Sequence, residues 1–249
     1  MRIAYVNLID DATLTPVSED LIYPVENVQN QRLAKPWRTT SLTGVSVVAD
    51  LGGTASVMMA AILGHNLTTS ATLTISGNTT SSFVAPSYTT SMTSVDGIIL
   101  KYFGAAQELR YWQYTIEDPT NTAAYVEVGR LWLGVFLQVE PTSTVDFSVN
   151  KRRSDTVTYG RGRQKYATEG VGWRAFDLSF DYVAGTALTA VQTLVDTVGL
   201  HSSFIFSNFD SSLDYDIVLP CYVSIADELG FRHKQHMAFG YTLKLEEDR

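Results

Sequence analysis

Four histidines and scattered carboxylates are the residues of this 249-residue chain whose types could support catalysis or metal binding. His233 and His236 stand three positions apart, a spacing that would place two metal ligands on one face of a helix. The residues around them are typical of a turn that enters a strand, where side chains three apart point to opposite faces. We therefore favour solvated turn residues over a metal pair.

Three aspartates, Asp210, Asp214 and Asp216, lie close together, and Asp10 and Asp11 are adjacent near the start of the chain. A calcium loop of the EF-hand type needs a central glycine and a terminal glutamate, and a helix follows it. The segment with the three aspartates has neither residue and precedes a strand-like stretch. We favour a turn over a calcium site here.

Nucleophilic catalysis finds little support in the sequence. His65 has neither a Gly-x-Ser-x-Gly turn nor a cysteine partner, and we expect it to pack or to form a hydrogen bond at a strand end. Gly160-Arg161-Gly162 is too short for a phosphate-binding loop. The one cysteine, Cys221, excludes an internal disulfide, and its apolar neighbours indicate a buried, unreactive thiol. We predict a chain that is not an enzyme and has no cofactor.

The elements that would position these residues are strands. Alternating apolar and polar residues, with Gly, Asn or Asp-Pro between the runs, predict strands at 43–52, 56–66, 70–78, 96–104, 109–119 and 124–138. Within the fifth run, Trp112 and Tyr114 share one face, and Tyr111 and Gln113 share the other. Strands at regular spacing without long helices between them are typical of a β-sandwich.

The pattern changes after residue 140. Residues 144–170 predict two strands around a basic loop, and residues 173–183 predict a central strand. Apolar residues at helical spacing predict one helix over about 186–198. The fold class is therefore all-β: a β-sandwich over residues 1–140, followed by a β-barrel or sheet with one packed helix over residues 141–249.

The charge of the chain limits its partners. A net charge of −8 argues against nucleic acid, which requires a basic face. Charged residues are only 18%, below the roughly 25% usual in soluble domains, which suits a surface that meets other proteins. No signal peptide or membrane-spanning run is visible, so we expect synthesis in the cytoplasm and no membrane partner. The local exception is a basic stretch, which we predict to be a subunit interface: Arg152, Arg153, Arg161, Arg163 and Lys165.

Two long segments, 23–41 and 78–97, are predicted to be loops. In the loop at 23–41, two prolines favour extended backbone, and we expect Trp37 to be buried as a structural anchor. The loop at 78–97 is rich in hydroxyl groups and contains Phe83 and Tyr88. We expect these two aromatic residues to contact a neighbouring protein, with a glycan as the alternative.

Over residues 8–136, an ordered series of short motifs resembles a known family. The series is Tyr-Pro-x-x-Asn, Trp-Arg-Thr, Asp-Leu-Gly, Gly-His-Asn-Leu, Arg-Tyr-Trp, an Asp-Pro turn and Val-Gly-Arg-Leu-Trp-Leu-Gly. It is similar to the discoidin-like, galactose-binding-fold β-sandwich, in the version carried by tail-tip proteins of long-tailed bacteriophages. Residues 141–249 are more loosely similar to the remainder of such proteins.

This resemblance implies a structural virion protein, a distal-tail or baseplate subunit that joins the tail tube to the hub and fibres. Such a subunit would form a homo-oligomeric ring, a trimer or hexamer, assembled in the host cytoplasm and located at the tail tip. The alternative is a carbohydrate-binding module for host-surface adhesion. A third reading is a hydrolase whose site forms only between subunits.

Overall fold

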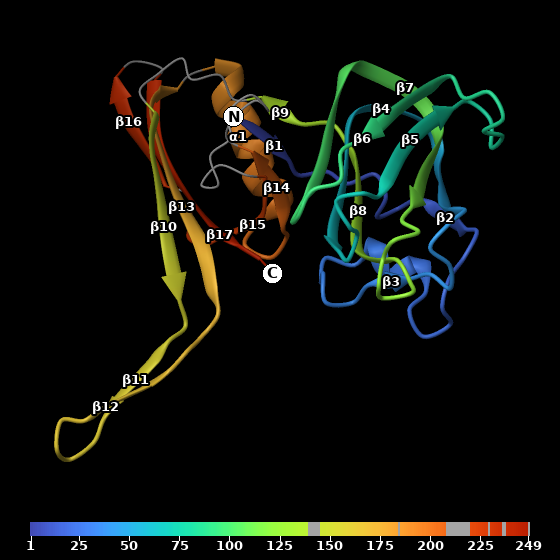
Figure 1. The fold of residues 1–249 in the computed structure, drawn as a ribbon. Helices are drawn as coiled ribbons and strands as arrows, with labels where there is room; N and C mark the ends of the chain where they lie inside the picture. The colour runs from blue at the N-terminus through green and yellow to red at the C-terminus, as the bar shows by residue number, and fades with distance from the viewer. Residues whose placement is uncertain (139–144, 184, 208–219, 229, 236–237, 249) are drawn as a thin grey trace. The chain divides into compact units, whose positions relative to one another are not determined.

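The computed structural model describes residues 1–138, 145–183, 185–207, 220–228, 230–235 and 238–248. These residues form two compact units (Figure 1). The sandwich unit is Val6–Phe136, and the sheet unit combines Met1–Tyr5 with Leu137–Arg249. The boundary expected at residue 140 lies outside the described residues, and the first five residues group with the sheet unit.

The sandwich unit is built from seven strands and one 3-10 helix. The hydrogen-bonded order is β3-β8-β4-β7-β5-β6, and β2 pairs with β4. The elements are β2 (Thr13–Pro16), η1 (Val25–Gln29), β3 (Trp37–Arg38), β4 (Val45–His65), β5 (Thr72–Asn78), β6 (Tyr88–Met92), β7 (Ile99–Glu117) and β8 (Glu127–Gly134).

One bent ribbon of β4 and β7 supplies strands to both layers of the sandwich. Residues 45–50 of β4 pair with 111–116 of β7, and residues 59–62 pair with 99–102. The register shifts between these two stretches, where Gly52 has a φ of 74°, a conformation that favours glycine. The strands expected at 43–52 and 56–66 are thus one strand, because the glycines bend it without ending it.

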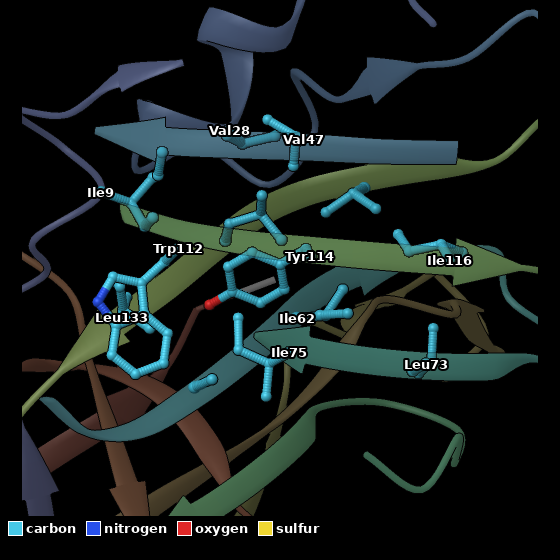
Figure 2. Packing of buried hydrophobic residues seen from close by; sticks show 14 of the residues in the cluster. Ile9, Val28, Val47, Ile62, Leu73, Ile75, Trp112, Tyr114, Ile116 and Leu133 are labelled. Carbon is cyan, nitrogen blue, oxygen red and sulfur yellow. The ribbon is translucent and has the colours of Figure 1, made fainter. Parts of the chain in front are cut away.

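The core lies between the two layers (Figure 2). Trp112 and Tyr114 point inward from β7, as their alternation predicts. The hydroxyl of the fully buried Tyr114 donates a hydrogen bond of 2.6 Å to the carbonyl of Trp132 on β8. This bond joins the two layers through the core, and burial raises the pKa of the Tyr114 hydroxyl.

The sheet unit contains a larger antiparallel sheet and one helix. Its strand order is β10-β13-β17-β15-β14-β1-β9, and β16 pairs with β17. The elements are β1 (Arg2–Ala4), β9 (Leu137–Gln138), β10 (Val145–Arg153), β13 (Gly172–Val183), α1 (Gly185–Val198), β14 (Phe204–Ser207), β15 (Cys221–Ile225), β16 (Phe231–Gln235) and β17 (Ala238–Glu247).

The sandwich unit is inserted between two neighbouring strands of the sheet unit. Ile3 of β1 pairs with Leu137 of β9 on one side and with Phe206 of β14 on the other. The chain therefore leaves the sheet after β1 and returns beside β1 as β9. The insertion places both ends of the sandwich unit at one pair of adjacent strands.

The predicted fold class is confirmed: the described residues are mostly strands, with a sandwich-like N-terminal part and one helix near the expected bounds. Val191, Leu194 and Val198 form the buried stripe of α1, and Gly199 follows it with a φ of 58°. No helix among the described residues is long and apolar enough to cross a membrane.

We predict that Tyr114→Phe lowers the free energy of unfolding by about 1 to 2 kcal/mol, because it removes a fully buried hydrogen bond and leaves the ring in place. Urea unfolding followed by tryptophan fluorescence measures the change. Tyr111→Phe, on the outer face of the same strand, is the matched control and should change stability much less. Equal losses in the two variants would contradict a special role for this bond.

Candidate binding and assembly surfaces

Four side chains gather at the loop end of the sandwich unit and form the tyrosine–arginine cluster: Tyr23, Arg38, Tyr125 and Glu127. The guanidinium carbon of Arg38 lies 4.0 Å from the ring centroid of Tyr23 and 4.9 Å from that of Tyr125. Its Nε donates to Glu127 Oε2 at 2.6 Å. Cation–π contacts and an ion pair therefore hold one guanidinium in place.

Local strand geometry explains how this cluster reaches the surface. Trp37 and Arg38 are consecutive in β3, so their side chains point to opposite faces. Trp37 is fully buried, and Arg38 is paired in register with Glu127 on β8. The Arg38 amide donates to the carbonyl of Tyr23 at 3.0 Å, which brings the Tyr23 loop alongside β3.

The cluster is a surface feature with modest energetics. The side chains of Arg38 and Glu127 are 29% and 26% exposed, so water screens much of their attraction. Their hydrogen bond raises the pKa of Arg38, which keeps the guanidinium charged. The arrangement offers aromatic rings, a cation and a carboxylate together, which are groups that bind polar ligands with apolar faces.

Neighbouring loops at this end are held by a buried carboxylate. Asp118, fully buried, accepts hydrogen bonds from the Thr68 amide at 2.9 Å and hydroxyl at 2.5 Å, and from the Asn121 amide group at 3.1 Å. These three contacts tie the β4–β5 loop to the turn after β7. The loop end is therefore an ordered surface.

The second surface is the hairpin arm, formed by β11 (Thr156–Tyr159), β12 (Lys165–Thr168) and the turn between them. Figure 1 shows β10 and β13 leading into this two-stranded ribbon. All eight strand residues of the arm are exposed. The turn is closed by a hydrogen bond from the Gly160 amide to the Gln164 carbonyl at 2.9 Å.

The five basic residues predicted to form a subunit interface fall into two groups. Arg152 pairs with Glu246, and Arg153 pairs with Asp155 and Glu169. The second group consists of Arg161, Arg163 and Lys165. They lie exposed on the arm, and no ion pair engages them in the part of the chain that the structure describes. The arm thus carries three charges that no described residue of its own unit neutralises in an ion pair.

The two aromatic residues of the 78–97 loop lie in different environments. Phe83 is half-buried in the loop before β6. Tyr88 begins β6 and packs against Phe103, with ring centroids 4.9 Å apart, and against Trp112 at 6.1 Å. Tyr88 therefore packs against the core, whereas Phe83 stands in a loop.

The residues considered for metal binding do not assemble into a site in the described structure. Among the described residues, no group of three or more His, Cys, Asp or Glu side chains could hold a metal ion. Asp10 forms an ion pair of 2.7 Å with the buried Arg130, and the ring of His233 meets that of Phe239 edge-on. Four residues named above lie outside the described ranges: Asp210, Asp214, Asp216 and His236.

Burial shifts the pKa of two residues whose types can be reactive. Burial raises the pKa of the Cys221 thiol to about 12, so it stays protonated at neutral pH. His65 Nδ1 accepts a hydrogen bond of 3.2 Å from the Leu67 amide, which places the ring proton of the neutral form on Nε2. The His65 side chain thus forms a hydrogen bond at the end of β4.

Sequence reasoning missed the tyrosine–arginine cluster. Tyr23 and Arg38 come from one end of the sandwich unit's sequence, and Tyr125 and Glu127 come from the other. Only the Trp-Arg pair in β3 carried a signal, since a buried tryptophan forces the next strand residue outward. The pairing of β3 with β8 cannot be read from either segment alone.

No protein-family model matches the sequence, and no curated protein matches it. Several solved structures similar to part of the chain are carbohydrate-binding modules by their titles. A fucose binding module from Streptococcus pneumoniae is 11% identical, covers 52% of this chain and 95% of its own, and has a TM-score of 0.42. The chitosan-binding module 1 of a Paenibacillus sp. IK-5 chitosanase/glucanase is 16% identical, covers 52% and 98%, and has a TM-score of 0.41. A family 32 module of C. perfringens NanJ, solved with galactose, is 13% identical, covers 53% and 98%, and has a TM-score of 0.43.

We predict that His65 makes stability depend on pH. Burial lowers the pKa of His65, an effect that the nearby Asp96 opposes less strongly. The unfolded chain therefore binds this proton more readily than the folded chain. Stability should be fully present above the ordinary histidine pKa of about 6.5 and should be lost as the pH falls through the folded-state pKa.

Thermal unfolding of the wild type and His65→Asn between pH 7.5 and 5 measures this dependence. The variant should show a flatter pH profile over that range. His201→Asn, at an exposed position of the sheet unit, is the control and should keep the wild-type slope. Parallel profiles for the wild type and His65→Asn would contradict the prediction.

Proposed function

We propose that this chain is a non-enzymatic structural subunit that assembles into a closed homo-oligomeric ring through its hairpin arm. The observation that carries the proposal is that all eight strand residues of the arm are exposed. Tyr159 and Tyr166 are 68% and 55% exposed on this ribbon. An isolated two-stranded ribbon is marginally stable in water, so the arm is suited to being covered by a partner.

Charge favours another copy of the chain as that partner. The arm residues 156–168 contain three basic residues and no acidic one, although the whole chain has a net charge of −8. A basic arm on an acidic chain attracts other copies and orients them as they approach. A one-way contact, in which the arm of each copy binds an acidic surface of the next copy, is heterologous and closes into a ring at a suitable rotation.

The sequence resemblance supports a specific setting for this ring, the tail tip of a long-tailed bacteriophage. In that setting the subunit joins the tail tube to the hub and fibres, as a trimer or hexamer. The protein would be assembled in the host cytoplasm and would function in the virion. This setting rests on the ordered motifs of residues 8–136, and the ring itself rests on the arm.

We expect light scattering of the purified chain to give a molecular mass that is a whole multiple of 27.5 kDa, as a closed ring requires. Arg161→Glu/Arg163→Glu should shift the mass towards the monomer, because it reverses the charge of the arm. Arg32→Glu/Lys35→Glu makes the same charge change at exposed positions of the sandwich unit and is the matched control. A wild-type monomer at every concentration, or an arm variant that assembles normally, would overturn the proposal.

A second candidate function is carbohydrate binding by the sandwich unit, and the tyrosine–arginine cluster favours it. A sugar presents C–H faces, which the rings of Tyr23 and Tyr125 can contact, and paired hydroxyls, which Arg38 and Glu127 can bind. The similar solved structures bind fucose, chitosan or galactose by their titles, and we propose this ligand class for the sandwich unit.

A glycan array tests the second candidate and separates its two possible sites. If the cluster is the site, Tyr125→Ala should lower the affinity for the glycan at least about tenfold. Phe83→Ala should do so if the 78–97 loop is the site, and each variant is the control for the other. We avoid Tyr88→Ala because Tyr88 packs against the core. No binding by the wild type to any glycan would reject this candidate.

A further inference from the structure

Two strongly exposed aliphatic side chains of the sandwich unit are adjacent in one ordered loop, residues 17–26, which we call the acidic loop. Leu21 is 97% exposed and Ile22 is 78% exposed. A protein that holds two adjacent aliphatic side chains in water commonly uses them at an interface.

The acidic loop presents these side chains on a firm frame. The Asp20 amide donates to the Arg38 carbonyl at 2.8 Å, and Asp20 Oδ1 accepts from the Ile22 amide at 2.8 Å. Glu19 Oε2 accepts from the Val25 amide at 3.0 Å. Such a loop loses little conformational entropy on binding, so its apolar contacts contribute more fully to affinity.

The charge of the acidic loop is opposite to that of the hairpin arm. Residues 17–26 contain the three carboxylates Glu19, Asp20 and Glu26 and no basic residue. The arm, residues 156–168, contains Arg161, Arg163 and Lys165 and no acidic residue. The two segments therefore carry equal and opposite formal charges.

The arm also offers an apolar face that suits the tip of the acidic loop. Val157 is paired with Ala167, and Tyr159 is paired with Lys165. Directly paired residues and alternate residues of a ribbon share a face. Val157, Tyr159 and Ala167 thus lie together on one side, and the basic residues lie beside them and at the turn.

We infer that the acidic loop of one copy docks on the hairpin arm of a second copy. Leu21 and Ile22 contact the Val157–Tyr159 face, and Glu19 and Glu26 face the basic residues of the turn. Apolar contact at the centre with opposite charges around it is the usual anatomy of a specific interface. The inference rests on the proposed ring and names the surface that receives the arm.

Other occupants fit the acidic loop less well. Three carboxylates without a basic residue are repelled by an anionic membrane surface. The aliphatic side chains of Leu21 and Ile22 supply no polar group that could select a sugar. A basic protein surface with an apolar face matches both properties, and the arm is such a surface within this chain.

Mutually compensating charge reversals test the docking. Glu19→Lys/Glu26→Lys and Arg161→Glu/Arg163→Glu should each raise the concentration for half-assembly at least about tenfold. An equimolar mixture of the two variants should regain assembly into rings with an even number of copies, because wild-type arms meet wild-type loops in alternate contacts and reversed arms meet reversed loops in the others. Asp20 is left unchanged because its carboxylate supports the loop. Glu19 also supports the loop through the Val25 amide, so Glu26→Lys alone, which leaves both bonds in place, is made beside the double variant and should weaken assembly in the same direction.

Two further variants test the contribution of the apolar tip and exclude a general effect of net charge. Leu21→Ser/Ile22→Ser changes side chains that project into water, so it should fold normally and still assemble at least about tenfold more weakly. Glu108→Lys/Asp196→Lys makes the same charge change at other exposed positions and should assemble as the wild type does. Circular dichroism confirms that each variant is folded.

The outcomes separate this inference from the proposed function. If only the arm variant loses assembly and both loop variants assemble normally, the arm has another receptor and the inference fails while the ring stands. If the wild type never assembles, both fail. Wild-type binding to phosphatidylcholine vesicles that Leu21→Ser/Ile22→Ser abolishes, with assembly unchanged, would assign the loop to a membrane and overturn the inference.

Discussion

The bent ribbon of β4 and β7 is the constraint on which the sandwich unit depends. Its two strands are separated in sequence by β5 and β6, yet they pair along most of their length and supply both layers, so the same two strands lie on both sides of the core. The bend requires a register shift and a glycine at positive φ, both of which lie near Gly52. A hydrogen bond from Tyr114 to the Trp132 carbonyl then fixes the spacing of the layers at the centre of the core.

The loop end follows from this arrangement. Because β3 pairs with β8 at the margin of the bent sheet, Trp37 is buried and Arg38 emerges beside Glu127. The Arg38 backbone then binds the loop that carries Asp20 and Tyr23 on both its amide and its carbonyl. One short strand therefore positions both the tyrosine–arginine cluster and the exposed tip of the acidic loop. A substitution that displaces β3 would displace the side chains of both surfaces.

Local periodicity predicted the β class, the faces of residues 111–114 and the helix, because each depends on side chains a few residues apart. The joining of two expected strands into β4 was missed, since a glycine that bends a strand resembles one that ends it. The three residues of β1 are too few to show a strand periodicity. No pattern in the sequence therefore indicated that the chain begins in the sheet unit and that the sandwich unit is inserted into it. Tyr23 and Tyr125 come together around Arg38 only through the tertiary fold, and no local sequence pattern predicts that arrangement.

The distribution of ion pairs along the arm gives the strongest physical reason to look for a partner. At the base of the arm, Arg153 lies between Asp155 and Glu169, so the charge is balanced locally. Towards the turn, the described structure places no carboxylate in an ion pair with Arg161 or Arg163. Screening at physiological salt limits charge attraction to about 8 Å, so distant carboxylates of the same chain do not balance these cations. A protein partner that balances this charge has to approach the arm closely, and in the docking proposed above an ordered loop with three carboxylates and an apolar tip would supply both the charge and the contact area.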